Sequence, residues 1–422
     1  MLRSWPAAVA LAAVVFGLCQ LPGAPGRLTP DSTEYLVQTL HLLGDSPQQA
    51  RERTLVAFCQ RYRPLELVPL SPTGRVDPTS GAARVAECEN RVRAQGAIAS
   101  DTRFGPAITE GGPIVSGRYE AIFLARPGMA VLFAPAVALF GPAWGVWLTI
   151  LLCAVAAGVL VAVVLRTVGL AAPLALLGQV LFYVLPTGKW AMAPLAESPT
   201  LLLVLVALLG AVRMLNGRLR SGIALLVIAH VAGFTIKYSQ FLLVGVGMAA
   251  AAGIALAFRS LRSRPMLLIA VISGVAAVAN LGLAAALGWP SGYESAQDLL
   301  TVHFTQPDVP NPYYQLLRLN RYFWSWWIVQ QLLAPLLLVA WLAGAWALLR
   351  GRRAFGVLVL GVAAAGLANQ AGHPMALQVD RLYVLAWLVA VCGLPVLVER
   401  LARWRDADHV LPAGEPAPGA AA

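Results

Sequence analysis

The side chains best suited to chemistry in this sequence are single carboxylates and basic residues in short polar segments between long apolar ones. Asp31 could act as a general base, because a carboxylate within hydrogen-bond reach can take a proton from a reacting hydroxyl. Glu34 and Tyr35 follow at helical spacing and would share a helix face with it. The alternative is that Asp31 only stabilises a helix N-terminus, where negative charge is favoured.

Further along the chain, basic residues with neighbouring carboxylates could hold an anion, since lysine and arginine both bind phosphates. Glu120 and Arg126 stand just before a short apolar stretch, and Lys189 and Glu197 flank a turn between two longer ones. An arginine at a membrane interface can instead extend its charged head to lipid headgroups. Both interpretations stay open at this point.

The same choice applies to the last polar segments. Lys237 and Lys189 are the only lysines of the chain, and both fall in segments between apolar stretches. Arg381 and Tyr383 stand at the start of the final apolar stretch, and Arg381 follows Asp380, with which it could form a plain ion pair. These cations would have a chemical role only if other elements bring them to Asp31.

Composition excludes an ordinary soluble enzyme. The 422 residues are 59% hydrophobic and only 12% charged, with a formal net charge of +11, whereas a soluble chain is about one-quarter charged. A strongly basic chain can indicate nucleic-acid binding, because clustered basic side chains neutralise phosphates. The positions of the basic residues decide between that interpretation and a membrane protein.

Apolar stretches long enough to cross about 30 Å of hydrocarbon recur along the chain. They predict an all-α integral membrane protein with about ten transmembrane helices, at 5–23, 144–166, 171–190, 198–214, 221–238, 239–258, 266–287, 323–349, 355–371 and 380–398. The first stretch lacks a clear cleavage site, so we expect it to remain as an uncleaved helix.

Basic residues in the short loops alternate with these stretches. On this topology 14 basic residues fall on the side of the N-terminus and five in the short loops of the other side. Because positive charge is retained in the cytoplasm, we expect both termini to be cytoplasmic. The preference for arginine over lysine is typical of a GC-rich bacterial genome, which indicates a bacterial plasma membrane. The net charge then reflects topology, and no nucleic-acid partner is expected.

One apolar stretch does not fit this alternation. Residues 128–141 are too short for a crossing, and counting them as one would invert every later loop. We therefore expect a short re-entrant or interfacial helix on the outer side. It would close a large first extracytoplasmic loop, which starts with a helix over 31–43 that has Thr29 as its N-cap and Pro30 at its first position.

These expectations divide the chain into a first transmembrane helix (1–23), an extracytoplasmic loop with interfacial helices (24–143), a transmembrane bundle (144–398) and a disordered cytoplasmic tail (399–422). Within the loop, the middle (64–82) is rich in Pro, Gly, Ser and Thr and is expected to be irregular. Cys59 and Cys88 lie in the same loop and could form a disulfide if it is extracytoplasmic. No Cys/His cluster indicates a metal site.

Several short elements, taken in order, resemble the GT-C class of polytopic glycosyltransferases, to which protein O-mannosyltransferases and lipid A aminoarabinose transferases belong. They are Pro30-Asp31-Ser32-Thr33-Glu34-Tyr35-Leu36, Arg126-Pro127-Gly128 with the run ending Leu139-Phe140-Gly141, Pro194-Leu195-Ala196-Glu197-Ser198-Pro199-Thr200, Thr235-Ile236-Lys237, and Arg381-Leu382-Tyr383. The chain departs from the class where many members have two adjacent prolines, at Ala125-Arg126-Pro127, and where many have an aspartate in place of Glu197.

The resemblance implies an active site on the extracytoplasmic face, with Asp31 as the catalytic base or as the residue that orients the acceptor. It also implies that Lys237 and Arg381, with Lys189 as a further candidate, hold the phosphate of a polyprenyl-phosphate sugar donor in the membrane lipid. The acceptor would be a glycan, a lipid or a protein. Some members of the class use a divalent cation, so the resemblance also allows a divalent-cation cofactor here.

The sequence thus predicts a glycosyltransferase that transfers a sugar from a polyprenyl-phosphate carrier to an acceptor hydroxyl. Asp31 is the candidate catalytic residue, and the candidate substrate-binding residues are Glu34, Tyr35, Glu120, Arg126, Lys189, Glu197, Lys237, Arg381 and Tyr383. One alternative is a transporter or flippase of a lipid-linked saccharide, which would use the same cations without a base. Another is a non-catalytic membrane protein whose long outer loop binds a partner protein.

Overall fold

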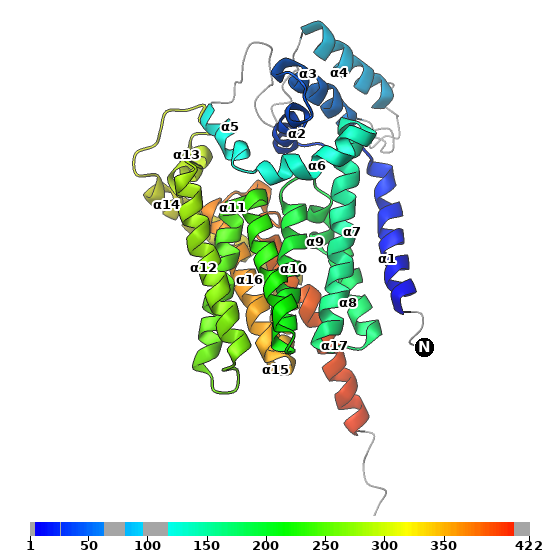
Figure 1. Ribbon diagram of the computed structural model, residues 1–422, viewed down its shortest axis with the longest axis vertical. Coiled ribbons are helices and arrows are strands. Elements are labelled where there is room, and N and C mark those ends of the chain that lie inside the picture. The colour runs from blue at the N-terminus through cyan, green and yellow to red at the C-terminus, as the bar shows by residue number, and fades with distance from the viewer. Residues whose placement is uncertain (1–4, 26, 63–80, 96–116, 409–422) are drawn as a thin grey trace, which may run out of the picture.

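The structure is a computed structural model that describes residues 5–25, 27–62, 81–95 and 117–408, and within them every regular element is a helix. The helices are α1 (Trp5–Gln20), η2 (Leu21–Gly23), α2 (Pro30–Leu42), α3 (Pro47–Cys59), α4 (Gly81–Gln95), α5 (Gly117–Leu124), α6 (Pro127–Phe140), α7 (Pro142–Val168), α8 (Ala172–Val184), α9 (Pro186–Ala191), α10 (Glu197–Leu215), α11 (Leu219–Ala257), α12 (Arg264–Ala286), α13 (Gly292–Leu300), α14 (Pro312–Leu333), α15 (Leu336–Gly351), α16 (Arg353–Gly372), η4 (Ala376–Gln378), η5 (Val384–Trp387) and α17 (Leu388–Asp408). Long helices stand side by side in a bundle, with α2 to α6 gathered at one end of it (Figure 1). The predicted all-α fold is confirmed.

Seven helices of the described residues are long and apolar enough to cross a membrane, or nine if each of two bent helix pairs counts as one span. The seven are α1 with η2, α7, α10, α11, α12, α16, and η5 with α17. Each coincides with a stretch that the sequence predicts to span the membrane. The chain is therefore a multi-pass membrane protein.

Proline interrupts the predicted span at 171–190. Helix α8 ends after 13 residues because Pro186 disfavours helical geometry at the residue before it, and Leu185 is extended (φ −78°, ψ 172°). The short helix α9 then starts at Pro186. This part of the chain is thus a 13-residue helix followed by a separate turn of helix, rather than one continuous span.

A second proline breaks the predicted span at 323–349. Ala334 leaves helical geometry (φ −132°, ψ 76°) directly before Pro335, and α14 and α15 meet at 87°. Of the predicted continuous helix, residues 336–349 belong to α15, which continues to Gly351. The other part continues α14, which begins well before the predicted span, at Pro312.

Helix α11 reverses its direction at Lys237, where the backbone is not helical (φ −159°, ψ 75°). The ring centroids of His230 and Phe241 lie 6.2 Å apart, although a straight helix would separate these positions by about 16 Å along its axis. The two halves of α11 therefore pack against each other as an antiparallel pair. This geometry agrees with the two predicted helices, 221–238 and 239–258, that meet next to Lys237.

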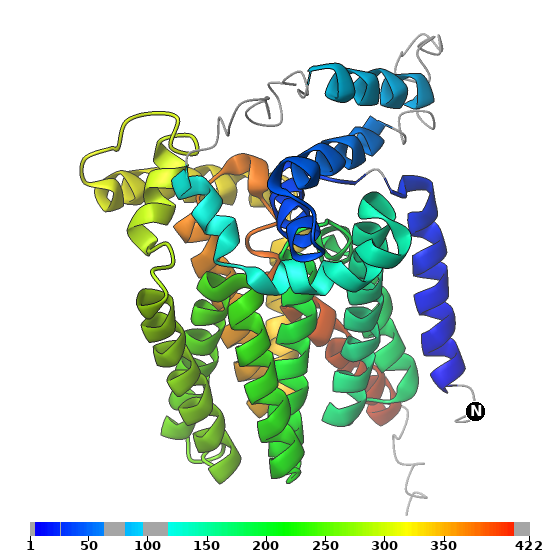
Figure 2. The ribbon, with the colours of Figure 1, turned by 45° about the horizontal axis from the view of Figure 1, so that its top comes forward.

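Helices α2 to α6 form a layer across one end of the bundle (Figure 2). Helix α2 begins as predicted, with Thr29 as N-cap accepting a hydrogen bond from the Ser32 backbone N–H and with Pro30 as first residue. A disulfide between Cys59 and Cys88 joins α3 to α4. Helix α6 lies crosswise to the bundle and is bent by 70° from α5, as expected of a re-entrant or interfacial helix.

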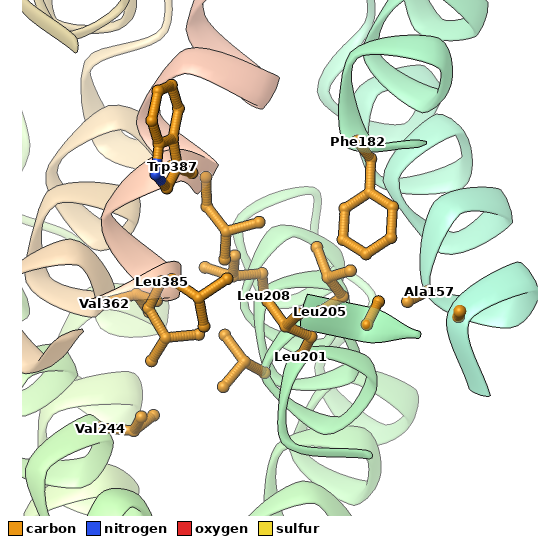
Figure 3. Close-up of a cluster of buried hydrophobic side chains, with 14 of the residues drawn as sticks. Ala157, Phe182, Leu201, Leu205, Leu208, Val244, Val362, Leu385 and Trp387 are labelled. Atoms are coloured by element: carbon orange, nitrogen blue, oxygen red, sulfur yellow. The ribbon is translucent and has the colours of Figure 1, made fainter. Parts of the chain in front are cut away.

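The bundle packs around an apolar core that continues up to this layer. Side chains from α7, α8, α10, α11, α16 and η5 meet in it, among them Ala157, Phe182, Leu201, Leu205, Leu208, Val244, Val362, Leu385 and Trp387 (Figure 3). Glycines allow close approach of backbones: a Cβ added at Gly247 of α11 would clash with the carbonyl oxygen of Gly361 in α16. The core thus fixes the helix ends that carry polar residues.

Arginine-bearing turns lie at the end of the bundle away from α2. Helix α10 runs 19 residues, about 28 Å, from Glu197 to Leu215 and carries Arg213 at its end, and Arg218 follows in the connection to α11. The second half of α11 runs a similar distance from Lys237 to the turn at Arg259. Figure 1 shows the α11–α12 turn at the lower end of the bundle, opposite the α2–α6 layer.

Two predicted irregular segments fall mostly outside the described residues. Of the segment 64–82, only residues 81 and 82 are described, and they are helical because α4 starts at Gly81. Of the tail predicted to be disordered (399–422), residues 399–408 are helical because α17 continues to Asp408, so the prediction is wrong for them. The remainder of both segments lies outside the described part of the chain.

Candidate functional site

Four charged side chains from four separate segments form a continuous series of ion pairs that runs from α2 into the end of the bundle. Arg381 donates from Nη2 to Asp31 Oδ2 at 2.6 Å and from Nε to Glu197 Oε1 at 3.1 Å. Lys237 Nζ donates to the same Glu197 oxygen at 3.0 Å. All four residues are candidates from the sequence, and the structure brings them together. We call them the ion-pair chain.

Two of the four residues are held by the ends of bundle helices. Glu197 is the first residue of α10, where a carboxylate is stabilised by the positive end of the helix dipole. Lys237 stands where α11 reverses, so its side chain leaves the helix pair at the end of the bundle. The core packing of α10 and α11 therefore fixes the buried half of the ion-pair chain.

The other two residues lie nearer to the surface. Asp31 occupies the first turn of α2, directly after the N-terminal Pro30. Arg381 follows Asp380, whose left-handed backbone (φ 66°) turns the chain between η4 and η5. Asp380 is held in this conformation by a hydrogen bond that Trp387 Nε1 donates to its Oδ1 at 3.1 Å. This turn directs Arg381 toward two carboxylates.

Burial decreases along the ion-pair chain. The side chains of Glu197 and Lys237 are 1% and 7% exposed, those of Arg381 and Asp31 17% and 27%. Because charges removed from water are costly unless paired, the buried half holds the structure of the site. Asp31 is the most exposed member of the ion-pair chain, and its Oδ1 makes no hydrogen bond within the described residues.

Arg126 lies near the ion-pair chain, but it binds a neutral hydroxyl instead of a carboxylate. It is the N-cap of α6 and donates from Nη1 to the hydroxyl of Tyr35, one turn after Asp31 on α2, at 2.5 Å. Its Nε is buried and has no hydrogen-bond partner in the described part of the chain, where Arg126 forms no ion pair. Glu197 Oε2 is likewise buried and has no hydrogen-bond partner among the described residues.

The ion-pair chain and Arg126 taken together carry an excess of one positive charge. Arg126, Lys237 and Arg381 contribute three formal positive charges, against the two negative charges of Asp31 and Glu197. Buried charges normally have partners, and the missing partner of Arg126 would be an anion. Lys237 and Arg381, which the sequence predicts to bind phosphate, are already paired with carboxylates. Their phosphate-binding role stays a prediction.

Glu34 adds an acidic group of different character to the same face of α2. Burial raises the pKa of Glu34 from 4.5 to about 7, and the nearby charges of Glu120 and Asp31 act in the same direction, whereas Arg51 opposes them. Glu34 is thus partly protonated at neutral pH. Glu120 of α5 enters the site through this electrostatic interaction.

Two candidates have other surroundings. The ammonium of Lys189 is exposed on α9 and lies 5.0 Å from the ring centroid of Trp190. Tyr383 is fully buried, and its hydroxyl accepts a hydrogen bond from Trp327 Nε1 at 3.2 Å. Tyr383 thus belongs to the packing between α14 and η5, away from a surface that substrate could contact.

The structure also shows neighbours that the sequence did not predict. Arg118 of α5 donates to Glu294 of α13 at 2.9 Å and to Asp308 at 2.7 Å. These partners are 176 and 190 residues away, and no local pattern signals such a contact. His303 bonds Asp298 at 2.9 Å, which raises the pKa of His303. These contacts tie the loop after α13 to α5.

No group of three or more His, Cys, Asp or Glu side chains within the described ranges could hold a metal ion. The two carboxylates of the ion-pair chain bind basic side chains instead. Comparison of the whole chain with known protein families and with curated proteins finds no match.

Proposed function

We propose that this protein is a membrane glycosyltransferase of the GT-C type, which transfers a sugar from polyprenyl phosphate to an acceptor hydroxyl. The observation that carries the proposal is the placement of an accessible carboxylate, Asp31, beside Arg126, whose charge no described carboxylate neutralises by an ion pair. Tyr35 links the two, because it lies one turn from Asp31 and binds Arg126. Transfer from a phosphate carrier needs such a base and such a cation.

Arg126 binds the donor phosphate in this proposal. A guanidinium has five N–H donors, and Arg126 uses one of them for Tyr35 within the described residues. The outward side chains Leu124 and Val131 on either side of it are 56% and 60% exposed. They offer an apolar path for the polyprenyl tail. This proposal moves the main phosphate contact from Lys237 and Arg381 to Arg126.

Asp31 accepts the acceptor's proton on Oδ1. As the proton leaves, the acceptor oxygen forms a bond to the anomeric carbon of the sugar. The bond between that carbon and the phosphate oxygen breaks, and its electron pair leaves with polyprenyl phosphate. Arg126 stabilises the negative charge that develops on this leaving group. Attack opposite to the phosphate inverts the configuration at the anomeric carbon.

The remaining members of the ion-pair chain act as positioning residues. Arg381 holds Oδ2 of Asp31 and leaves Oδ1 for the acceptor. Glu197 orients Arg381, and Lys237 balances the charge of Glu197. These roles agree with the burial of the four residues. Glu197 and Lys237, which only position others, are buried, and Asp31, which meets the acceptor, is the most exposed.

The proposal includes a topology with ten crossings and both termini in the cytoplasm. The seven apolar helices supply seven crossings, the reversal in α11 adds one, and the shorter helices α8 and α15 add two. The support for the orientation is that arginine-bearing turns lie opposite the α2–α6 layer, as retention of positive charge in the cytoplasm predicts. The site then faces the extracytoplasmic side.

A transfer assay tests this function. Purified full-length protein is incubated with a set of polyprenyl-phosphate sugars and with glycan, lipid and peptide acceptors. Arg126→Gln is expected to raise the KM for the donor at least about tenfold, since a charge-assisted hydrogen bond contributes roughly 1.5–3 kcal/mol. Arg321→Gln, which removes an exposed arginine of α14, is the matched control and should behave like the wild type.

Two results would contradict the proposal. One is the absence of transfer from every donor by protein that is folded. The other is movement of a lipid-linked saccharide across the membrane of reconstituted vesicles without any transfer, which would favour a flippase. Arg126→Gln with an unchanged KM would remove Arg126 from the site.

A further inference from the structure

A cavity at the end of the bundle opposite the ion-pair chain is lined by two arginines and by no carboxylate. It has a volume of about 510 Å³ and lies between the start of α1, the end of α7 and the turn from α10 to α11. Its lining residues are Trp5, Val163, Arg166, Thr167, Asn216 and Arg218. Neither the ion-pair chain nor Arg126 is part of it.

Hydrogen bonds fix the walls of this cavity. Asn216 Nδ2 donates to the Thr167 carbonyl oxygen at 2.7 Å and so joins the α10–α11 turn to the end of α7. Arg166 Nη1 donates to the Leu170 carbonyl oxygen at 2.6 Å, just beyond that helix. The Arg166 guanidinium also lies 5.8 Å from the ring centroid of Trp5. The cavity is therefore formed by mutually connected residues.

No ion pair among the described residues compensates the charge of the two arginines in the cavity. Within the described residues, neither Arg166 nor Arg218 forms an ion pair, and Arg166 uses one of its five N–H donors for Leu170. Two guanidinium groups that share a cavity attract an anion, and their planar donor pattern fits phosphate oxygens. The negative end of the α7 dipole is offset in part by Arg166 itself.

The location specifies the source of that phosphate. Helix α1, one wall of the cavity, is only 17% buried in its apolar window, so the cavity opens next to lipid. Trp5 at its rim is of the kind found at membrane interfaces, and Leu11 and Val14 of α1 are 64% and 56% exposed. Basic pockets between transmembrane helices bind anionic headgroups. We propose that this cavity binds the phosphate group of an anionic phospholipid.

This proposal is independent of the transfer reaction, because it needs only the membrane location. Arg166 and Arg218 would hold the phosphate, and the acyl chains would lie along α1 and α7. The site would favour phosphatidylglycerol or cardiolipin over phosphatidylcholine, whose headgroup carries a compensating positive charge. Bound lipid would also fasten α1 to the bundle.

Native mass spectrometry of the full-length protein tests the proposal. The protein is titrated with phosphatidylglycerol, cardiolipin or phosphatidylcholine, and separately with inorganic phosphate. The wild type is expected to retain the two anionic lipids, and the double variant Arg166→Gln/Arg218→Gln to bind them at least about tenfold more weakly, given the roughly 1.5–3 kcal/mol of a charge-assisted hydrogen bond. The control Arg264→Gln/Arg353→Gln removes two exposed arginines outside the cavity and should bind like the wild type.

Because Arg166 also binds the end of α7, its replacement could impair folding. Arg218→Gln alone removes no side-chain hydrogen bond of the described residues and should still weaken lipid binding several-fold. Equal lipid binding by the wild type and both cavity variants would overturn the proposal, as would equal binding of phosphatidylcholine. Inorganic phosphate that binds alone and displaces the lipids at equal concentration would assign the cavity to free phosphate and overturn the lipid assignment.

Discussion

At the scale of single residues, the contrast between paired and unpaired charges organises the site. Glu197 receives hydrogen bonds from both Lys237 and Arg381 on one oxygen. Within the described residues, Arg126 donates a side-chain hydrogen bond to the hydroxyl of Tyr35 and to no carboxylate. We expect the paired cations to maintain the structure, and we propose that Arg126, which forms no ion pair among the described residues, binds an anion. A sequence pattern identifies all four residues as charged, but only their contacts separate these two roles.

The buried pair Glu197 and Lys237 allows a first prediction. Glu197→Gln should destabilise the protein by roughly 3–5 kcal/mol, because it leaves Lys237 as an uncompensated buried charge. Lys237→Met should cost less, because Glu197 keeps Arg381 as an ion-pair partner. The double variant should lose much less than the sum of the two, since both charges are gone. Thermal unfolding of the purified variants in detergent measures this. Additive losses would show that the pair is not coupled.

Glu34 predicts a pH dependence of stability. Its pKa is raised from 4.5 in the unfolded chain to about 7 in the folded protein, so the unfolded state loses its proton first as the pH rises. The stability that the neutral form provides is complete below pH 4.5 and is lost through pH 7, by roughly 3 kcal/mol in total. Glu34→Gln should remove this part of the pH dependence and be more stable than the wild type at pH 8. Parallel melting curves of the two proteins between pH 5 and 8 would contradict it.

At the scale of elements, the crossing of α6 over α11 positions Arg126. A Cβ added at Gly128 would clash with the Thr235 side chain and lie 2.9 Å from the Thr235 carbonyl carbon. Gly128→Ala should therefore push α6 away from α11, lower the melting temperature and raise the KM for the donor. Gly253→Ala is the control, because nothing lies within 4 Å of its added Cβ. It should be neutral or slightly stabilising. Equal behaviour of the two variants would show that this contact does not position Arg126.

Some features of these helices could be predicted from the sequence, and others could not. The start of α2 was predictable, because Thr29 and Pro30 act locally. The breaks at Pro186 and Pro335 were not predicted, although proline is visible in the sequence, because an apolar window averages over a single residue. The bond between Asp31 and Arg381 joins residues 350 positions apart. Only packing of the intervening helices brings them together.

At the scale of the whole molecule, the separation of the arginine-bearing turns from the α2–α6 layer predicts an orientation. In a background with Cys19→Ser, Gln48→Cys in α3 should react with a membrane-impermeant maleimide added to intact cells. Ser260→Cys in the α11–α12 turn should react only after the membrane is permeabilised. Both positions are exposed, so accessibility to the protein surface does not limit either reaction. The reverse pattern would place the site in the cytoplasm and contradict the proposed topology.

The same view of the molecule separates two anion sites of different kinds. Arg126 and the carboxylate Asp31 both belong to the α2–α6 layer. Arg166 and Arg218 lie at the other end of the bundle without one. Only the first combines a base with a cation, and only the first is proposed to carry out chemistry.

In the proposed reaction, Asp31 acts in the chemical step and not in donor binding. The most direct test is a single-turnover experiment with one labelled polyprenyl-phosphate sugar, which measures donor affinity and transfer rate for the wild type and Asp31→Asn. We predict a donor affinity within about threefold of the wild type and a transfer rate about 100- to 10,000-fold lower, the usual contribution of a general base. A folded Asp31→Asn protein that transfers sugar at the wild-type rate would show that Asp31 is not the general base of the reaction.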